Sequence, residues 1–278
     1  MKIKCDCGHE FEISEKDIHS HRILCGDATK EADIQRLMDG KKADMCFCDP
    51  PYGVSYSDKN TFLNAIDKGN HLQDKIEGDA YQQDNTEEIW LSAFQNIKAT
   101  LADNASFHIC SAQGGELQMM MMMMMNKAEL DFHHMLVWVK NNHVLGRSDY
   151  NYKHEPILYG WNKKHTFYGK GDQKTSVWQY DKPHKSDLHP VMKPVGLVAN
   201  ALLNSSKKGD ICIDFFLGSG TTIIAAEQTG RICFGCEIDP HYIDVILDRY
   251  AKLTGDDPIR SDGVKWSELK SSLREQTD

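Results

Sequence analysis

The sequence predicts an α/β fold, with a Rossmann-like, doubly wound and mainly parallel sheet. Short apolar runs typical of buried strands alternate with segments of helical spacing, and two of these runs lead into turns rich in glycine or proline. Strands that alternate with helices form a parallel sheet covered on both faces, and such sheets bind ligands beyond the carboxyl ends of their strands. We therefore expect a ligand site at these two turns.

The first half of the chain is predicted to contain alternating strands and helices separated by short connections. In order, the pattern predicts a strand at 22–27, a helix ending at Met38, a buried strand at 43–48, a helix at 87–101, and strands within 105–112 and 133–140. Seven consecutive methionines, Met119–Met125, lie between the last two strands, and we expect a helix there because methionine favours helices. Residues 55–85 are polar and aperiodic, so we expect a loop that closes over the substrate.

The second half repeats a strand–turn–helix unit. The pattern predicts a helix at about 194–204 and then two such units, at 209–230 and 231–250. We expect one α/β domain over residues 22–255. A polar segment at 1–21 precedes it, and a polar or helical tail at 256–278 follows it.

The composition argues against several classes of protein. The 278 residues carry 32 basic and 41 acidic side chains, a net charge of −9, and 40% are hydrophobic, which is ordinary for a globular protein. No window approaches the roughly 18 apolar residues that span a bilayer, and the charged start lacks the apolar core of a secretory signal. Nine cysteines, mostly in apolar runs, indicate reduced thiols. We therefore expect a cytoplasmic protein with no membrane partner.

Two local clusters stand out from this average. Between Lys140 and Lys208 the chain holds 12 Lys/Arg and five Asp/Glu, a local balance of +7, together with eight aromatic residues. This mixture suits phosphate contact and base stacking, and it suits a solvated insertion equally well. Cys5, Cys7 and His9 form a second cluster, but their spacing matches no standard zinc site, so we expect no metal.

The segment 214–222, Asp-Phe-Phe-Leu-Gly-Ser-Gly-Thr-Thr, follows a predicted strand and opens a predicted helix. Gly218 and Gly220 let the backbone turn tightly and approach a ligand, while the start of the helix offers amide and hydroxyl donors for a carboxylate. A phosphate loop would require a lysine before the hydroxyl residues, and a full dinucleotide motif would require glycine in place of Ile223. A tight turn without a ligand is the alternative interpretation.

Acidic residues end two other predicted strands. Glu237 follows the strand in 231–236, where a carboxylate can accept hydrogen bonds from both hydroxyls of a ribose, and Asp239 predicts a helix cap. Asp49-Pro-Pro-Tyr52 ends the strand at 43–48, and its prolines remove backbone donors while leaving carbonyl acceptors. A carboxylate, these carbonyls and a phenol ring together form a site for a planar amine.

These motifs resemble the S-adenosylmethionine-dependent DNA amino-methyltransferases, which methylate exocyclic nitrogens of bases. The resemblance covers about residues 22–250, and the order of its motifs is similar to that of the permuted beta group. The motifs are DPPY (49–52), HPVMKP (189–194), FLGSGTT (216–222) and EIDPHY (237–242). The sequence has HPVMKP where HPTQKP is commoner and DFF where DPF is commoner.

Carried over residue by residue, the resemblance assigns a set of site residues. The catalytic residues would be Asp49, Pro50, Pro51 and Tyr52. The cofactor-binding residues would be Asp27, Lys193, Asp214, Phe216, Gly218, Ser219, Gly220, Thr221, Thr222 and Glu237. Among these, Asp27 would contact the adenine of the cofactor and Glu237 its ribose, while Lys193 and one of the two threonines would hold its carboxylate. A target-recognition insertion at about 141–188 would contact DNA through Arg147, Lys153, Lys163, Lys164 and Lys170.

The resemblance also implies an activity. It implies S-adenosyl-L-methionine as the cofactor, double-stranded DNA as the partner, a class I methyltransferase fold and a restriction–modification role in a bacterial cell or a phage. Dimerisation is common in the group. DPPY is usual for adenine-N6 enzymes, so we expect methylation of adenine N6 after the base is flipped out of the duplex. The alternatives are a cytosine-N4 enzyme, an RNA target, a non-catalytic DNA-binding relative and a dinucleotide-dependent oxidoreductase. No cysteine follows a proline, which argues against a cytosine-C5 enzyme.

Overall fold

The computed structural model describes residues 2–4, 11–12, 20–52, 85–143, 149–169, 174–181 and 192–275. Within these ranges the strands form one mixed sheet in the order β2-β11-β1-β3-β10-β9-β4-β5-β7-β6-β8. The strands are β1 (Lys2–Lys4), β2 (Phe11–Glu12), β3 (Arg22–Cys25), β4 (Ala43–Cys48), β5 (Leu101–Cys110), β6 (Phe132–Val139), β7 (His154–Trp161), β8 (Val177–Gln179), β9 (Ile211–Asp214), β10 (Ile232–Glu237) and β11 (Ile259–Arg260). The helices are α1 (Glu31–Met38), α3 (Thr86–Thr100), α4 (Gly115–Lys127), α5 (Val195–Ser205), α6 (Thr221–Thr229), α7 (Pro240–Thr254) and α8 (Trp266–Glu275).

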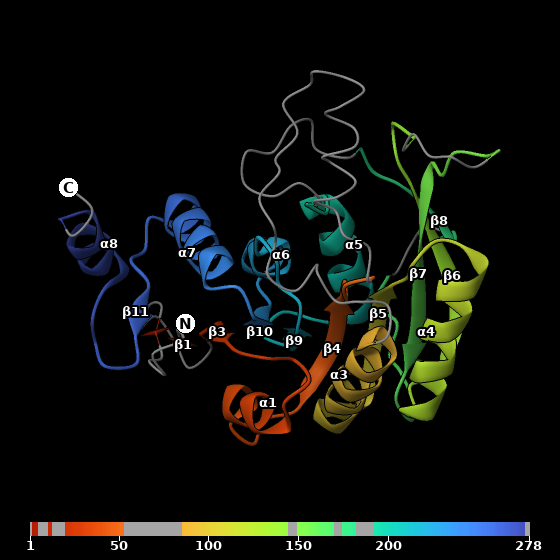
Figure 1. The fold of residues 1–278 in the computed structure, drawn as a ribbon, viewed down its shortest axis with the longest axis horizontal. Coiled ribbons are helices and arrows are strands. Elements are labelled where there is room, and N and C mark those ends of the chain that lie inside the picture. The colour runs from red at the N-terminus through yellow and green to blue at the C-terminus, as the bar shows by residue number, and fades with distance from the viewer. Residues whose placement is uncertain are drawn as a thin grey trace.

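Helices cover both faces of this sheet. Along β4, Met45 and Phe47 pack with α5, α6 and α7, whereas Cys46 and Cys48 pack with α1, α3 and α4. Successive side chains of a strand point to opposite faces, so a strand covered on both faces is apolar throughout. Figure 1 shows the two layers of helices on opposite sides of the sheet. The α/β class predicted from the alternation of strands and helices is confirmed.

The connections between strands diverge at β9 and β4, which are neighbours in the sheet. The strands β3, β10, β9, β4 and β5 all run parallel. From β9 the chain passes through α6 to β10 on one side, and from β4 it passes through α3 to β5 on the other side. A crevice forms beyond the carboxyl ends of the strands where such connections diverge. The residues that follow β4, β9 and β10 therefore meet at one place.

The strand β7 runs antiparallel between β5 and β6, in the middle of the range 141–188 that we expected to form an insertion. Its residues from Pro156 to Gly160 are buried, because its apolar run packs on both sides of the sheet. The short strand β8 also belongs to the sheet and pairs with β6. The described portion of the expected insertion therefore supplies two strands to the sheet.

Segments near both ends of the chain extend the sheet. The strand β1 pairs in parallel with β3 and with β11, so parts of 1–21 and 256–278 belong to the same sheet as the expected domain. The indole N–H of Trp266 in α8 donates a hydrogen bond to Oδ1 of Asp248 in α7 at 2.8 Å. Figure 1 shows β1, β11 and α8 together at one end of the molecule. Within the described ranges, no helix has the length and apolar character needed to cross a membrane.

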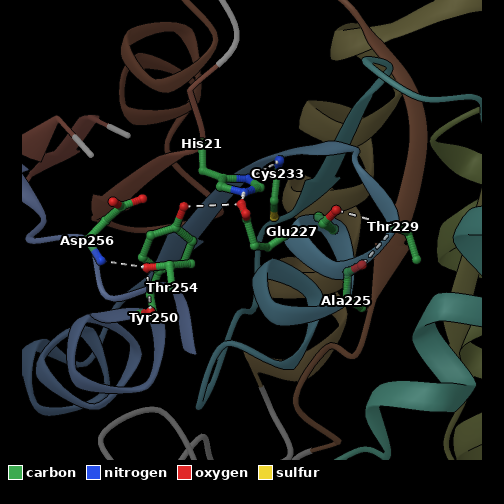
Figure 2. A network of polar contacts seen from close by, with 9 residues as sticks. His21, Ala225, Glu227, Thr229, Cys233, Tyr250, Thr254 and Asp256 are labelled. Carbon is green, nitrogen blue, oxygen red and sulfur yellow. Dashed lines mark hydrogen bonds and ion pairs between the residues drawn. The ribbon is translucent and has the colours of Figure 1, made fainter. Parts of the chain in front are cut away.

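A buried histidine joins the start of β3 to α6, β10 and α7 (Figure 2). The amide of Cys233 donates to Nδ1 of His21 at 2.8 Å, so Nε2 carries the ring proton and donates to Oε2 of Glu227 at 2.8 Å. The hydroxyl of Tyr250 donates to the same Glu227 oxygen at 3.1 Å. Burial lowers the pKa of His21, although the neighbouring carboxylate opposes this effect. The neutral ring therefore ties four elements together at the amino-terminal edge of the sheet.

The seven methionines lie in α4, as expected. Met121, Met124 and Met125 are buried in the cluster that includes α3, whereas Met119 and Met123 are 64% and 53% exposed. A uniform run of residues defines no buried side of its own. The packing side of α4 is therefore set by the elements around it.

Candidate active site

One pocket opens where the ends of β4, β9 and β10 meet. It has a volume of about 180 Å³. Every residue predicted to be catalytic or to bind the cofactor lines this pocket except Gly220. The lining residues from that set are Asp27, Asp49, Pro50, Pro51, Tyr52, Lys193, Asp214, Phe216, Gly218, Ser219, Thr221, Thr222 and Glu237. The fold thus brings together motifs that lie far apart in the sequence.

Asp214 ends β9 and is held by the turn that follows it. Its Oδ1 accepts a hydrogen bond from the amide of Phe216 at 3.0 Å, and its Oδ2 accepts one from the hydroxyl of Thr222 at 2.6 Å. Burial raises the pKa of Asp214 to about 7, because the two hydrogen bonds offset only part of the lost solvation. Thr221 or Thr222 was expected to contact the cofactor carboxylate, and the hydroxyl of Thr222 donates to Asp214 in this structure.

Glu237 ends β10 and accepts two backbone hydrogen bonds. The amide of Gly218 donates to its Oε2 at 2.7 Å, and the amide of Asp239 donates to its Oε1 at 3.0 Å. Asp239 in turn accepts from the amide of His241 at 2.8 Å and caps α7, as predicted. Burial raises the pKa of Glu237 to about 7. The pocket therefore holds two buried carboxyl groups that a cationic ligand would stabilise in their ionised form.

Asp27 lies in the turn after β3, next to the end of β10. Its Oδ1 accepts hydrogen bonds from the amide and the hydroxyl of Thr29, at 2.9 Å and 2.7 Å. The amide of Gly26 donates to the carbonyl of Glu237 at 2.9 Å, which fixes this turn against β10. Asp27 and Glu237 consequently lie on one side of the pocket, and Asp49 lies at the end of β4.

The tetrapeptide Asp49–Tyr52 turns sharply away from β4. The hydroxyl of Tyr52 donates to Oδ1 of Asp49 at 2.7 Å, and burial raises the pKa of Tyr52 well above its usual value, so the phenol stays a neutral donor. The indole N–H of Trp90 in α3 donates to the carbonyl of Pro51 at 2.8 Å. The first contact joins the two ends of the tetrapeptide, and the second fixes the tetrapeptide to α3.

Lys193 is paired with carboxylates in this structure. Its ammonium contacts Oδ2 of Asp49 and lies 3.1 Å from Oε2 of Glu155, a residue at the start of β7. Burial alone would lower the pKa of Lys193, but the two carboxylates hold it well above its usual value. The predicted role of Lys193, binding the carboxylate of the cofactor, would therefore require it to leave or to share these partners.

Gly220 does not line the pocket and instead lies where α6 and α7 pack together. Its φ of +81° lies in the left-handed region, and a Cβ atom there would come within 2.7 Å of Ile246 in α7. The neighbouring Ser219 does line the pocket, and its hydroxyl accepts a hydrogen bond from Arg249 of α7 at 3.2 Å. The second glycine of the motif thus allows α6 and α7 to approach each other.

The described lysines that were predicted to contact DNA lie at opposite ends of the strand β7. Lys153 precedes β7 and is two residues from Glu155 of the pocket. Lys163 and Lys164 follow β7, and their amides donate to the carbonyl of Asp103 near the start of β5. Because β7 runs antiparallel to β5, these two residues lie at the edge opposite the pocket. Arg147, Lys170 and most of the expected lid at 55–85 lie outside the described residues.

Some residues of the pocket were not predicted. Ile238 and Tyr242 flank the acidic turn after β10 and line the pocket, and their place in the EIDPHY motif was an available signal. Glu155 is a different case, because a single glutamate before a proline carries no distinctive pattern. Among the described residues, no group of three or more His, Cys, Asp or Glu side chains is arranged to hold a metal ion.

The fold is similar to that of solved DNA methyltransferases. The chain superposes on the crystal structure of M1.HpyAVI in complex with S-adenosylmethionine, with a TM-score of 0.58 and 18% identity over 82% of this chain and 98% of that one. It also superposes on the cytosine-N4-specific PvuII DNA methyltransferase, with a TM-score of 0.61 and 14% identity over 83% of this chain and 86% of that one.

Residues 43–248 match the DNA methylase family of N6 and N4 methyltransferases, and the chain belongs to this family. A similar curated protein is the type II methyltransferase M2.MboI of Moraxella bovis, which is 25% identical over 96% of both chains. The resemblance to the DNA amino-methyltransferases is thereby confirmed. Enzymes of this family use S-adenosylmethionine. The pocket fits that cofactor, because the sulfonium and ammonium groups of the cofactor are positive and the pocket contains two buried carboxyl groups.

Proposed function

We propose that this protein transfers a methyl group from S-adenosylmethionine to the N6 amino group of adenine in double-stranded DNA. One observation carries the proposal: the carboxylate of Asp49 and the turn containing Asp214 line the same pocket. A carboxylate that can bind the target amine and a turn that can bind the cofactor thus line one pocket, where the two ligands would meet. Family membership supports the reaction, and DPPY supports adenine as the target.

The cofactor would supply an electrophilic methyl group on a positively charged sulfur. Glu237 would accept hydrogen bonds from its ribose, and Asp27 would accept one from its adenine amino group. Asp214 and the turn at Phe216–Gly218 would border its methionine portion. Both Asp214 and Glu237 have pKa values raised to about 7 by burial, so the positive charge of the ligand would favour their ionised forms.

Asp49 and Pro50 would bind the amino group that is methylated. An adenine amino group is a poor nucleophile, because its lone pair is delocalised into the ring. Hydrogen bonds from its two N–H groups to the Asp49 carboxylate and the Pro50 carbonyl would favour a pyramidal nitrogen whose lone pair faces the methyl group. Tyr52 holds Asp49 in place through its hydroxyl, which leaves the second lone pair of Oδ1 free to accept. Alignment of this kind supplies much of the rate enhancement.

The target nitrogen lies inside a DNA duplex, so the base must leave the helix to reach Asp49. Lys153 is exposed, lies two residues before Glu155 of the pocket, and would contact a phosphate near the flipped nucleotide. Contacts of this kind position the duplex without reading its sequence.

The test is methyl transfer from labelled S-adenosylmethionine to duplex DNA, with the modified base identified by mass spectrometry. We expect N6-methyladenine from the wild type and at least a ~100-fold lower rate from Asp49→Ala, since the lost contact acts mainly in the transition state. Calorimetry should show that Asp49→Ala still binds S-adenosylmethionine. The exposed variant Asp103→Asn, at the far edge of the sheet, serves as the control.

Other products would overturn parts of the proposal. N4-methylcytosine would make the protein a cytosine enzyme, and transfer to RNA alone would change the substrate. Binding of DNA with no transfer would identify a non-catalytic relative. If Asp49→Ala keeps normal transfer, or loses cofactor affinity instead, the pocket assignment is wrong.

A further inference from the structure

A chain of alternating charges leads from Asp49 into the interior. The ammonium of Lys193 lies between Asp49 and Glu155, and the other oxygen of Glu155 contacts the ammonium of Lys140. Lys140 and Lys193 are only 6% and 7% exposed. Asp49, Lys193 and Glu155 line the pocket, and the buried Lys140 lies behind Glu155.

The surroundings fix this chain of charges firmly. Trp138 is buried, and its ring lies 5.3 Å from the Lys140 ammonium and 5.9 Å from that of Lys193. The indole N–H of Trp138 donates to the carbonyl of Tyr180 at 2.7 Å, so the ring cannot turn away freely. Burial would raise the pKa of Glu155, but the two ammonium groups outweigh it and hold the pKa at about 2. Glu155 is therefore a permanent negative charge between two positive ones.

Such an arrangement is a poor way to stabilise a fold. Buried ion pairs recover little of the solvation that they lose, and apolar residues of similar size do as well or better. None of the elements that carry these groups requires a charge for its own formation. A role in the pocket accounts for the arrangement better, because the last member of the chain is the proposed target-binding carboxylate.

We propose that Glu155 is a positioning residue for methyl transfer: it holds the Lys193 ammonium at the edge of Asp49 and thereby fixes the carboxylate that receives the target amine. This inference rests on the proposed function. Without the charge of Glu155, Lys193 would pair with Asp49 alone. Its ammonium would then compete with the target N–H groups for the carboxylate oxygens of Asp49. Lys140 supports Glu155 from the other side.

The groups around this chain define what a substitution changes. Asp49 faces Lys193 from the turn after β4, where Tyr52 donates to it, and Cys110 at the end of β5 and Asp214 of β9 also lie near the ammonium. Among the described residues, Glu155 is the carboxylate that contacts both lysines, so these groups do not replace it. Glu155→Gln keeps the shape and removes the charge, whereas Glu155→Asp keeps the charge and shortens the side chain.

The experiment compares these two variants under saturating S-adenosylmethionine and DNA. We expect Glu155→Gln to lower kcat by ~10- to 100-fold, as a displaced catalytic group does, while the Kd for S-adenosylmethionine changes by less than about threefold. Glu155→Asp should retain more activity than Glu155→Gln, because charge matters more than shape. Lys140→Met should lower kcat by a smaller factor, and Asp103→Asn should leave it unchanged.

Thermal unfolding of each variant controls for loss of structure. If Glu155→Gln does not fold, Lys140→Met carries the test, with the same split between kcat and cofactor affinity expected. A normal kcat in Glu155→Gln, a parallel loss of cofactor affinity, or lower activity in Glu155→Asp than in Glu155→Gln would overturn the inference. Wild-type transfer is measured alongside, so an inactive wild type identifies a failure of the proposed function, and an active wild type with an active Glu155→Gln identifies a failure of this inference.

Discussion

The amide of Gly218 donates a hydrogen bond to Oε2 of Glu237 at 2.7 Å, and this contact links the turn after β9 to the end of β10. Glu237 thus has two roles in the structure, and the sequence indicated only the first of them. It borders the pocket, and it also holds the glycine turn in place. A ligand bound to Glu237 would consequently stabilise the turn as well.

We expect Glu237→Gln to weaken the binding of S-adenosylmethionine by ~10- to 100-fold, because a hydrogen bond to a charged group contributes about 1.5–3 kcal/mol. The glutamine keeps one oxygen for a backbone amide, so the loss of folding stability should be smaller than the loss of affinity. Calorimetry gives the affinity and urea denaturation gives the stability. Equal binding by the variant and the wild type would remove Glu237 from the cofactor site.

The binding of S-adenosylmethionine should strengthen as the pH rises from 6 to 8. The pKa values of Asp214 and Glu237 are raised to about 7, and a cationic ligand favours their ionised forms. Binding near pH 7 should therefore release protons, which calorimetry in buffers of different ionisation enthalpy detects. Asp214→Asn should release fewer protons than the wild type. A binding constant that is flat across this range would contradict the coupling.

Ionisation of Asp214 and Glu237 at higher pH favours cofactor binding but lowers the stability of the fold. Their folded pKa values exceed the unfolded ones, so the folded protein binds more protons between about pH 4 and pH 7 and loses their stabilisation as the pH rises through that window. His21 has the reverse effect, because burial lowers its pKa from 6.5. The unfolded chain takes up a proton there below pH 6.5, and stability is lost as the pH falls.

A comparison with His21→Gln isolates that contribution. The glutamine can retain a hydrogen bond to Glu227 but cannot titrate, so the free energy of unfolding should fall less steeply between pH 7 and pH 5 than in the wild type. The difference in slope has an upper limit of about 1.4 kcal/mol per pH unit, the value for one proton. Urea denaturation at three pH values measures it. Identical slopes would mean that folding does not shift the pKa of His21.

Gly220→Ala should destabilise the protein by about 1–3 kcal/mol, because the alanine adds both backbone strain and a clash with Ile246. Gly263→Ala is a matched control, since Gly263 has a similar φ of +89° but nothing within 4 Å of an added Cβ. The control should therefore show the strain alone. If the two variants lose equal stability, close packing of α6 on α7 is not the reason for the glycine.

Lys153→Gln should weaken DNA binding and should reduce the salt dependence by about one phosphate contact. The double variant Lys163→Gln and Lys164→Gln should leave both quantities nearly unchanged, because these residues lie at the opposite edge of the sheet and Lys163 pairs with Asp103 at 3.0 Å. Affinity measurements at several salt concentrations decide between them. A larger effect from the double variant would place DNA along the far edge.

The parallel part of the fold was predictable because its strands are apolar and end in recognisable turns. Asp214 and Glu237 could be placed at one edge of the sheet on that basis alone. The strand β7 was harder to predict, because its apolar core of Ile157 and Leu158 stands within a basic, aromatic-rich region that resembles an insertion. The antiparallel direction of β7 then decided which lysines lie near the pocket.

The partners of Lys193 could not be predicted from its motif. The ion pair with Asp49 joins residues 144 positions apart, and local patterns hold no information on contacts at that distance. Glu155 entered the pocket only because β7 runs antiparallel beside β5 and begins at the edge where β5 ends. Sequence motifs located the chemical groups, and the topology determined which of them meet.

The division of the methionine helix has a consequence for chemical damage. Met119 and Met123 on the outer side of α4 are the thioethers that an oxidant in solution reaches first, whereas Met121, Met124 and Met125 are shielded by the fold. Sulfoxides on the outer pair would add polarity where water already lies, and the apolar interior would stay intact. The outer thioethers would thus act as sacrificial scavengers that intercept peroxide before it reaches the buried ones.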